Sequence, residues 1–128
     1  MKGQLGELED AVMTRVWRLD RPVTVREVMV ELRRERTIAY TTVMTVMDKV
    51  HRKGLLSREL DGRAYRYTAV ATRADYAAAL MDEAWSHGGR RADTLVAFLG
   101  RMTADQRTAF EEALRILGSR AEPPATPP

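Results

Sequence analysis

The side chains best suited to chemistry in this chain lie on one face of a helix predicted between residues 38 and 56. At the helical angle of about 100° per residue, its polar side chains gather on one side, and these are Thr41, Thr45, Asp48, Lys49 and Arg52. The opposite side is an apolar stripe of Val43, Val46, Met47 and Val50. Threonine suits a merely solvated helix poorly, whereas hydroxyl, methyl and cationic groups together suit the edge of a DNA base and the phosphate beside it. The pattern therefore predicts a recognition helix that buries one face and presents the other to DNA.

The end of this helix and its single acidic position are also informative. Gly54 is expected to end the helix, because glycine readily adopts the left-handed conformation of a C-terminal cap. Asp48 has two interpretations: it accepts a hydrogen bond from a cytosine amino group, or it pairs with Arg52 four residues later, and the pairing is favoured. His51, beside Arg52, is interpreted as an ordinary surface or phosphate-side residue and not as a pH switch.

A β-hairpin is predicted directly after the helix. Residues 55–60 and 63–70 flank Asp61-Gly62, which is a strong signal for a two-residue turn. With that turn, the expected cross-strand pairs are Leu60 with Arg63, Arg58 with Tyr65, and Leu56 with Tyr67. The tyrosines and leucines would then share a face that covers the core. Arg63 would lie near the tip, within reach of phosphate or a narrow minor groove.

The elements predicted before this helix complete the element order of a known type of domain. A core helix is predicted over residues 6–19, with acids in its first turn and arginines in its last. Val23 is expected to form a short bridging strand, and Thr24 with Glu27 makes a capping box that starts a helix over residues 25–32. Helix, short strand, two helices and hairpin, in this order, predict a winged helix-turn-helix domain.

The charge is distributed unevenly along the chain. The net charge is +3, and residues 1–70 carry 14 Lys and Arg against 10 Asp and Glu, whereas residues 71–128 carry 7 against 8. The basic excess therefore lies in the first part, where a polyanion is expected to bind. Within it, residues 33–37 form a charged connection. Its basic residues either contact phosphate or remain solvated, and the sequence supports both equally; they are Arg33, Arg34 and Arg36.

Composition disfavours several other functions. The chain has no cysteine and two histidines, so no metal site and no cofactor are expected. No Gly-rich phosphate loop, HExxH or GxSxG motif is present, so the protein is not expected to be an enzyme. We expect no membrane insertion and a cytoplasmic location, because no run is long and apolar enough to span a bilayer and the N-terminal segment MKGQLGELEDA is acidic.

The rest of the chain is predicted to be helical. Thr72 with Asp75 caps one helix, Gly100 ends a second, and Thr103 with Gln106 caps a third that ends at Gly118. Such short apolar helices cannot close a core alone, so they are expected to pair with a second copy of the chain. The expected dimerisation residues are Tyr76, Leu80, Met81, Trp85, Leu95, Phe98, Leu99, Phe110, Leu114 and Leu117.

Together these patterns predict a mainly α protein with a small β-hairpin. The expected parts are a winged-helix DNA-binding domain over residues 1–71, a helical dimerisation region over 72–118, and a disordered tail over 119–128, whose sequence SRAEPPATPP is rich in proline.

Several motifs in fixed order resemble one bacterial family. They are LGELEDAVM, TVREV, AYTTVMTVMDKV, KGLL and DGRAYRY, and they are similar to those of the penicillinase-repressor family, the BlaI/MecI/CopY group of transcriptional regulators. The resemblance implies a homodimer that binds a palindromic DNA operator and blocks transcription. The base-contacting helix of the family matches residues 40–52, and its wing matches residues 58–66. The candidate DNA-binding residues are Tyr40, Thr41, Thr42, Met44, Thr45, Lys49, Arg52, Lys53, Arg58, Arg63 and Arg66.

The resemblance also bears on release from DNA. The copper-responsive branch of the family ends in paired cysteines, which this chain lacks, so copper sensing by thiolates is disfavoured. The β-lactam branch is cut by a membrane sensor protease at an Asn-Phe bond. That bond matches Ala97-Phe98 here, and the chain contains no asparagine. Two modes of release from DNA remain open. One is cleavage at that bond, in control of β-lactam-response genes, and the other is release by a small ligand or by falling protein concentration.

One further alternative is a winged helix that serves as a protein-interaction module, with the polar helix face binding a partner protein. The concentration of positive charge in residues 1–70 argues against it.

Overall fold

The computed structural model describes residues 5–121. These residues fall into two compact units that divide between Ala84 and Trp85, and each unit is described by itself. The division lies later in the chain than the domain boundary expected at residues 71 and 72.

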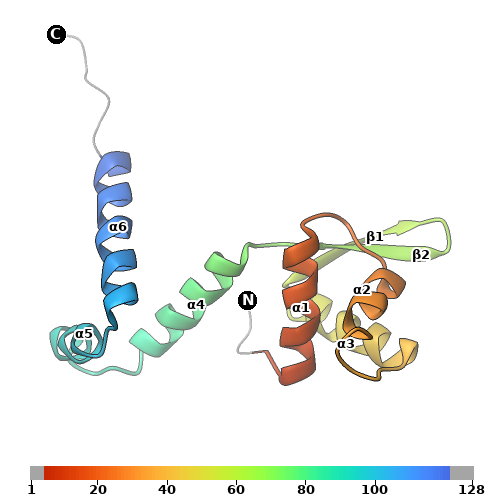
Figure 1. Cartoon of the computed structure of the whole chain (residues 1–128), viewed down its shortest axis with the longest axis horizontal. Helices are drawn as coiled ribbons and strands as arrows, with labels where there is room; N and C mark the ends of the chain where they lie inside the picture. Colours follow the sequence, from red (N-terminus) through yellow and green to blue (C-terminus); the bar gives the residue numbers. More distant parts are fainter. Residues whose placement is uncertain (1–4, 122–128) are drawn as a thin grey trace, which may run out of the picture. The chain divides into compact units, whose positions relative to one another are not determined.

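The first unit has the element order of a winged helix-turn-helix domain (Figure 1). Its elements are α1 (Glu7–Leu19), α2 (Val25–Leu32), α3 (Tyr40–Arg52), β1 (Leu56–Asp61) and β2 (Ala64–Ala69). Helix α3 packs against α1, α2 and β1, and α1 also contacts β2. Val23 forms an antiparallel bridge with Tyr67, through two backbone hydrogen bonds of 2.9 and 2.7 Å. The predicted fold class and the short bridging strand are therefore confirmed.

The core of this unit is built from the apolar faces that the sequence predicts. On α3 the buried residues are Val43, Val46, Met47 and Val50. Their partners across the core include Val12, Met13, Val16, Val28, Leu32, Leu55, Leu56 and Tyr67. Because the inward face of α3 is fully committed to this core, its opposite face is left at the surface.

Local signals set the helix ends as predicted. Glu27 N donates to Thr24 Oγ1 at 3.2 Å, and Thr24 N donates to Glu27 Oε1 at 3.3 Å, so the capping box of α2 is present. Gly54 has a φ of +87° directly after α3, which is the left-handed conformation expected of its cap.

The register of the hairpin differs from the prediction by two residues. Leu60 pairs with Tyr65 and Asp61 with Ala64, so the turn is Gly62-Arg63 and not Asp61-Gly62. Gly62 has a φ of +67°, whereas Asp61 stays in the strand. The observed turn has glycine as its first residue and needs a positive φ only there. The predicted Asp61-Gly62 turn would need a positive φ at both of its residues. The shared face contains the predicted leucines and tyrosines. Only the end of this face that lies away from the turn is buried, since Leu60 and Tyr65 near the turn are 65% and 42% exposed.

Helix α4 (Arg73–Trp85) begins on the first unit. Tyr76 is buried there, its ring lies 5.8 Å from the ring of Trp17, and its hydroxyl accepts a hydrogen bond from Leu5 N at 2.9 Å. Leu80 packs against the same core. Tyr76 is therefore buried within its own unit beside Trp17 of α1, and Leu80 is partly buried; their expected part in a dimer interface stays a prediction.

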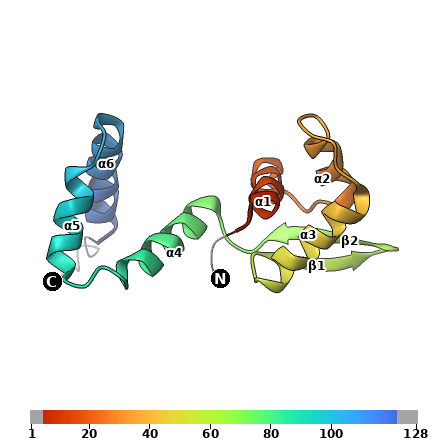
Figure 2. The ribbon, with the colours of Figure 1, turned by 90° about the horizontal axis from the view of Figure 1, so that it is seen from below.

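The second unit contains α5 (Arg91–Gly100) and α6 (Ala104–Ala121), which run at a steep angle to each other (Figures 1 and 2). Neither helix has a buried residue. Helix α6 continues three residues beyond its expected end, because Gly118 does not adopt a positive φ and the helix passes through it. Residues 119–121 of the expected tail are therefore helical, and residues 122–128 lie outside the described residues. No helix in the described part of the chain is long and apolar enough to span a membrane.

Candidate nucleic-acid interface

The outward face of α3 carries the polar residues that the sequence singled out. Thr41, Thr45, Lys49 and Arg52 are exposed, and Asp48 is half-buried. Thr45 Oγ1 donates to Thr41 O at 2.9 Å. Its proton is therefore engaged within the helix, while the exposed side chain keeps its oxygen lone pairs and its methyl group for other contacts. Such a hydroxyl can accept a hydrogen bond from a base amino group, and its methyl can contact a thymine methyl.

Asp48 connects the recognition helix with the wing. Its carboxylate pairs with Arg52 Nη2 at 2.8 Å and with Arg58 Nη1 of β1 at 2.9 Å. The Arg58 guanidinium also lies 4.3 Å from the centroid of the Tyr65 ring on β2. The predicted Asp48–Arg52 pair is confirmed, and the pair with Arg58 was not foreseen. Arg58 on the wing therefore has an acid partner, whereas the sequence analysis considered it only as a candidate DNA contact.

His51 joins the end of α3 to the start of the wing. Its Nδ1 lies 2.8 Å from the carbonyl oxygen of Leu56. A carbonyl can only accept, so Nδ1 carries the proton and Nε2 remains for solvent or another partner.

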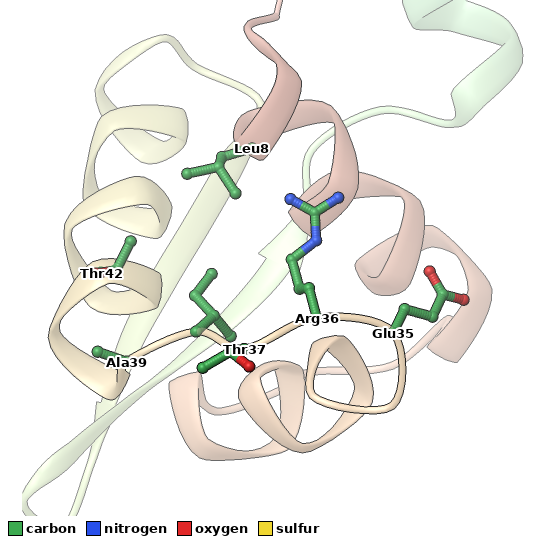
Figure 3. A pocket seen from close by; sticks show the side chains of 7 residues that line it. Leu8, Glu35, Arg36, Thr37, Ala39 and Thr42 are labelled. Atoms are coloured by element: carbon green, nitrogen blue, oxygen red, sulfur yellow. The ribbon is translucent and has the colours of Figure 1, made fainter.

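The start of α3 borders a cleft of about 480 Å³ (Figure 3). Its lining residues are Leu8, Glu35, Arg36, Thr37, Ile38, Ala39 and Thr42. Thr42 thus lies on the side of α3 toward α1, away from Thr41 and Thr45. Tyr40 and Met44 lie on the other margin, where they are 42% and 44% exposed.

The three arginines of the charged connection all have partners within the chain. Arg33 Nε donates to Ile38 O at 3.0 Å. Arg34 lies 3.5 Å from Glu31, and Arg36 lies 3.6 Å from Glu7. The last two pairs are exposed on at least one side, so they contribute little to stability and are easily exchanged.

Two candidate basic residues are held by acids of the first unit. Lys53 Nζ donates to Glu9 Oε1 at 2.9 Å, which ties the end of α3 to α1. Burial raises the pKa of Glu9, but hydrogen bonds from Lys53 and Gly6 and the charges of Lys53 and Lys49 outweigh it and leave the pKa lowered.

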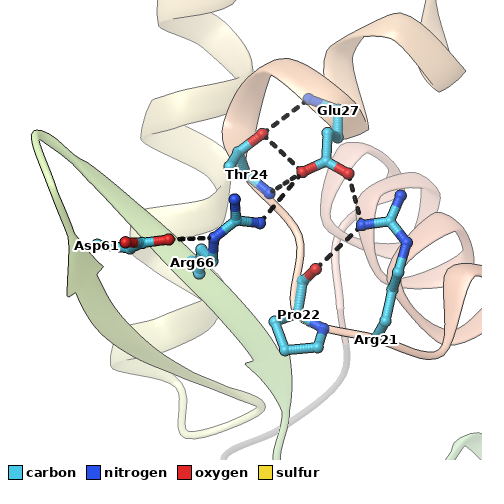
Figure 4. Close-up of polar contacts among 6 residues, drawn as sticks. All are labelled: Arg21, Pro22, Thr24, Glu27, Asp61 and Arg66. Carbon is cyan, nitrogen blue, oxygen red and sulfur yellow. Dashed lines mark hydrogen bonds and ion pairs between the residues drawn. The ribbon is translucent and has the colours of Figure 1, made fainter.

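Arg66 bridges the wing and α2 (Figure 4). Its guanidinium donates to Asp61 at 2.6 Å and lies 3.6 Å from Glu27, and Asp61 raises the pKa of Arg66. Burial also raises the pKa of Glu27, yet hydrogen bonds from Arg21 and Thr24 leave it lowered. Both Lys53 and Arg66 therefore shape the domain, and neither is an unpaired cation.

Other basic residues of α2, α3 and the wing form no ion pair within residues 5–121. They are Arg26, Lys49 and Arg63. Lys49 and Arg63 were expected at the interface. Arg26, at the second position of α2, was missed by sequence reasoning because nothing in its own helix indicates that the wing lies nearby. The same described residues contain no cluster of three or more potential metal ligands.

A second candidate surface is apolar. On α5 and α6, six of the expected dimerisation residues remain between 37% and 60% exposed, namely Leu95, Phe98, Leu99, Phe110, Leu114 and Leu117. On α4, Met81 is 64% exposed and Trp85 is half-buried. Ala97 and Phe98 lie inside α5, and both are exposed. Within the described residues of the second unit, α5 and α6 therefore leave large apolar side chains exposed.

Comparison with known proteins agrees with this arrangement. The family model described as penicillinase repressor matches residues 5–116. The transcriptional regulator BlaI of Mycobacterium tuberculosis, in strains CDC 1551 / Oshkosh and ATCC 25618 / H37Rv, is 41% identical over an aligned length of 127 residues, and the match covers 95% of this chain and 92% of the relative. Among solved structures, the DNA-binding domain of the repressor BlaI is 29% identical with a TM-score of 0.51, covering 59% of this chain and 94% of that one. The resemblance seen in the sequence motifs is confirmed, and the chain belongs to the penicillinase repressor family.

Proposed function

We propose that this protein is a sequence-specific DNA-binding transcriptional repressor that binds a palindromic operator as a homodimer. The observation that carries the proposal is the division of α3, whose apolar face is buried in a winged-helix core while Thr41, Thr45 and Lys49 remain exposed. Family membership and the likeness to the solved DNA-binding domain of BlaI support it. A repressor of this kind works beside the chromosome, so we assign it to the cytoplasm.

Within the interface, we assign different tasks to different side chains. Thr41 and Thr45 are the candidates for reading bases, because both are exposed on the polar face of α3 and each carries a hydroxyl and a methyl group. Lys49 and Arg52 are candidates for phosphate or guanine contacts at the end of the helix. Arg63 at the wing turn contacts the backbone or the minor groove. Arg58, Arg66 and Lys53 hold the wing and α3 in place through their acid partners.

The dimer is supported by the second unit. Phe110, Leu114 and Leu117 lie at helical spacing on α6 and are exposed in the single chain. Exposed apolar surface of this kind marks a protein interface. A twofold dimer places two recognition helices on half-sites about 10 base pairs apart, or a modest departure from that spacing.

Binding and oligomeric state test the proposal together. An operator is first selected from a pool of random duplexes, and affinity is then measured on operator and random DNA at several salt concentrations. We expect strong preference for operator, a steep loss of affinity with salt, and a dimer in sedimentation. Lys49→Ala should weaken binding without unfolding the protein, and Phe110→Asp should give monomers with much weaker operator binding.

The outcomes separate the alternatives. Binding that is insensitive to salt, or absence of any selected sequence, would favour the protein-interaction module and overturn the repressor. A wild-type monomer at micromolar concentration would overturn the dimer alone.

For release from DNA, we propose cleavage within α5 by a membrane sensor protease, as the β-lactam branch of the family suggests. The exposure of Phe98 and the shortness of α5 support access to the Ala97-Phe98 bond. Cutting there would detach α6 and its apolar residues from the DNA-binding unit. The test is an immunoblot of native cells exposed to a β-lactam. Full-length protein throughout induction of the target genes would exclude proteolysis and favour a small ligand or falling protein concentration.

A further inference from the structure

A groove of about 460 Å³ lies between the start of α2, the outer margin of α3 and the wing. Its lining residues are Thr24, Val25, Arg26, Tyr40, Met44, Arg63, Ala64, Tyr65 and Tyr67. Three elements that are separate in the sequence therefore form its walls. Met44 belongs to α3 itself, so the groove is continuous with the exposed face of the recognition helix.

The charge of the groove is positive and uncompensated. Two arginines line it, Arg26 from α2 and Arg63 from the turn of the wing, and none of the nine lining residues is acidic. Elsewhere in the same unit, arginines that approach the wing are paired: Arg58 with Asp48, and Arg66 with Asp61. The two groove arginines lack such partners within residues 5–121, so a bound anion would face no competing carboxylate on either wall.

The remaining lining groups also suit a phosphate on a sugar chain. Tyr40 and Tyr65 are both 42% exposed and supply phenol groups that can donate hydrogen bonds to phosphate oxygens. The first turn of α2, which contains Val25 and Arg26, adds the positive end of the helix dipole. Met44 and the tyrosine rings provide apolar surface against which a deoxyribose can pack.

From this geometry we infer that the groove holds the sugar–phosphate backbone of one operator strand, with Arg26 and Arg63 clamping a phosphate from α2 and from the wing. The strand reaches the groove as it passes from the base edges that face α3 toward the wing. This inference rests on the proposed function and assigns Arg26 to DNA binding. Contacts to phosphate carry no sequence information, so the clamp contributes affinity and register, and α3 contributes the choice of sequence.

The test compares three single variants, Arg26→Ala, Arg63→Ala and Arg18→Ala, on the selected operator and on random DNA. Arg18 is the matched control, because it is an exposed arginine of the same unit that does not line the groove. We expect each groove variant to lose about tenfold in affinity at 0.1 M salt, equally on both DNAs, and the salt slope to fall by about 0.9 per arginine. Arg26→Lys should restore most of the slope. Arg18→Ala should leave both quantities unchanged.

DNA in which a single phosphate is uncharged can locate the contact made by Arg26. Single methylphosphonate substitutions along one half-site remove one phosphate charge at a time. The wild type should lose affinity at one or two adjacent positions, and Arg26→Ala should be insensitive at the same positions. Circular dichroism of each variant confirms that the fold is retained.

The results distinguish this inference from the function on which it rests. If the wild type prefers the operator but Arg26→Ala matches Arg18→Ala, the clamp is overturned and the repressor stands. A changed operator preference in Arg26→Ala would show a base contact and also overturn the clamp. A wild type that selects no operator overturns the proposed function itself.

Discussion

Replacing Asp48 with asparagine tests how the chain controls positive charge at its DNA-binding face. Asp48 holds Arg52 at 2.8 Å and Arg58 at 2.9 Å, so one carboxylate screens two guanidinium groups. The Arg52 pair is an i,i+4 pair whose arginine side chain is 76% exposed. Such a pair contributes about 0.3 to 0.5 kcal/mol, so a phosphate can displace Asp48 easily. Arg58 should stay in place in the variant, because the Tyr65 ring also holds it.

The expected effect on binding follows from the charge that is released. Asp48→Asn leaves one more uncompensated positive charge at the face that binds DNA. If it gains one phosphate contact, the plot of log affinity against log salt becomes steeper by about 0.9, and affinity for random DNA at 0.1 M salt rises up to about tenfold. Operator affinity should rise less, because the freed Arg52 loses its fixed orientation. Discrimination between operator and random DNA should therefore fall. The folding stability should drop by about 0.5 kcal/mol or less from the Arg52 pair.

Fluorescence anisotropy over a salt series, on operator and random duplexes, measures both slope and discrimination. Asp10→Asn is the matched control, because it removes an exposed acid from the first turn of α1. In the double variant Asp48→Asn/Arg52→Ala, the added slope should disappear if Arg52 is the arginine released. Parallel salt plots for the wild type and Asp48→Asn would refute the reasoning, as would an equal steepening in Asp10→Asn.

Three further predictions concern single side chains. Thr45→Val keeps the shape but removes the outward lone pairs, so it should reduce discrimination at one operator position by about 1 to 3 kcal/mol in a selection experiment, and an unchanged preference would exclude base reading by Thr45. Glu9→Gln should lower stability at pH 7 by about 1 kcal/mol. The pKa of Glu9 in the folded protein lies below its ordinary value of 4.5, so the contribution of its carboxylate to stability is complete above pH 4.5 and is lost as the pH falls through the folded pKa. The prediction would be contradicted if Glu9→Gln lowered the melting temperature as much below that pKa as at pH 7. Tyr76→Ala should cost about 3 kcal/mol in thermal unfolding and Tyr76→Phe about 1 kcal/mol, for the lost bond from Leu5, with sedimentation unchanged in both; monomers would instead place Tyr76 in the dimer interface.

The sequence alone was sufficient wherever the deciding interactions are local. The capping boxes of Thr24 with Glu27, Thr72 with Asp75, and Thr103 with Gln106 are all present, because the two residues of each box are three positions apart. The buried stripe and the exposed face of α3 follow from helical periodicity in the same way. The order of elements, together with the motifs, was enough to predict the winged helix and the family.

The wing shows where local reasoning becomes ambiguous. Asp61-Gly62 and Gly62-Arg63 both offer a two-residue turn around the same glycine, and they differ by two residues in register. Both registers keep the same side chains on the same face, since side chains alternate with a period of two. The alternation pattern therefore could not distinguish them, and the backbone conformation at Gly62 decided the pairing.

Charge pairing and docking required the tertiary structure. Lys53 lies 44 residues from Glu9 in sequence, and Arg66 lies far from Glu27, so no spacing rule indicates that these acids hold the two cations. Tyr76 looks like part of an amphipathic dimer helix until α1 is seen to cover it with Trp17. By the same reasoning, Arg26 looks like an ordinary solvated arginine until the wing places Arg63 on the same groove. The sequence determined which elements form and which faces they bury, because those depend on neighbours one to four residues away. The tertiary structure decided which basic side chains remain unpaired, because that depends on which distant elements the packing brings together.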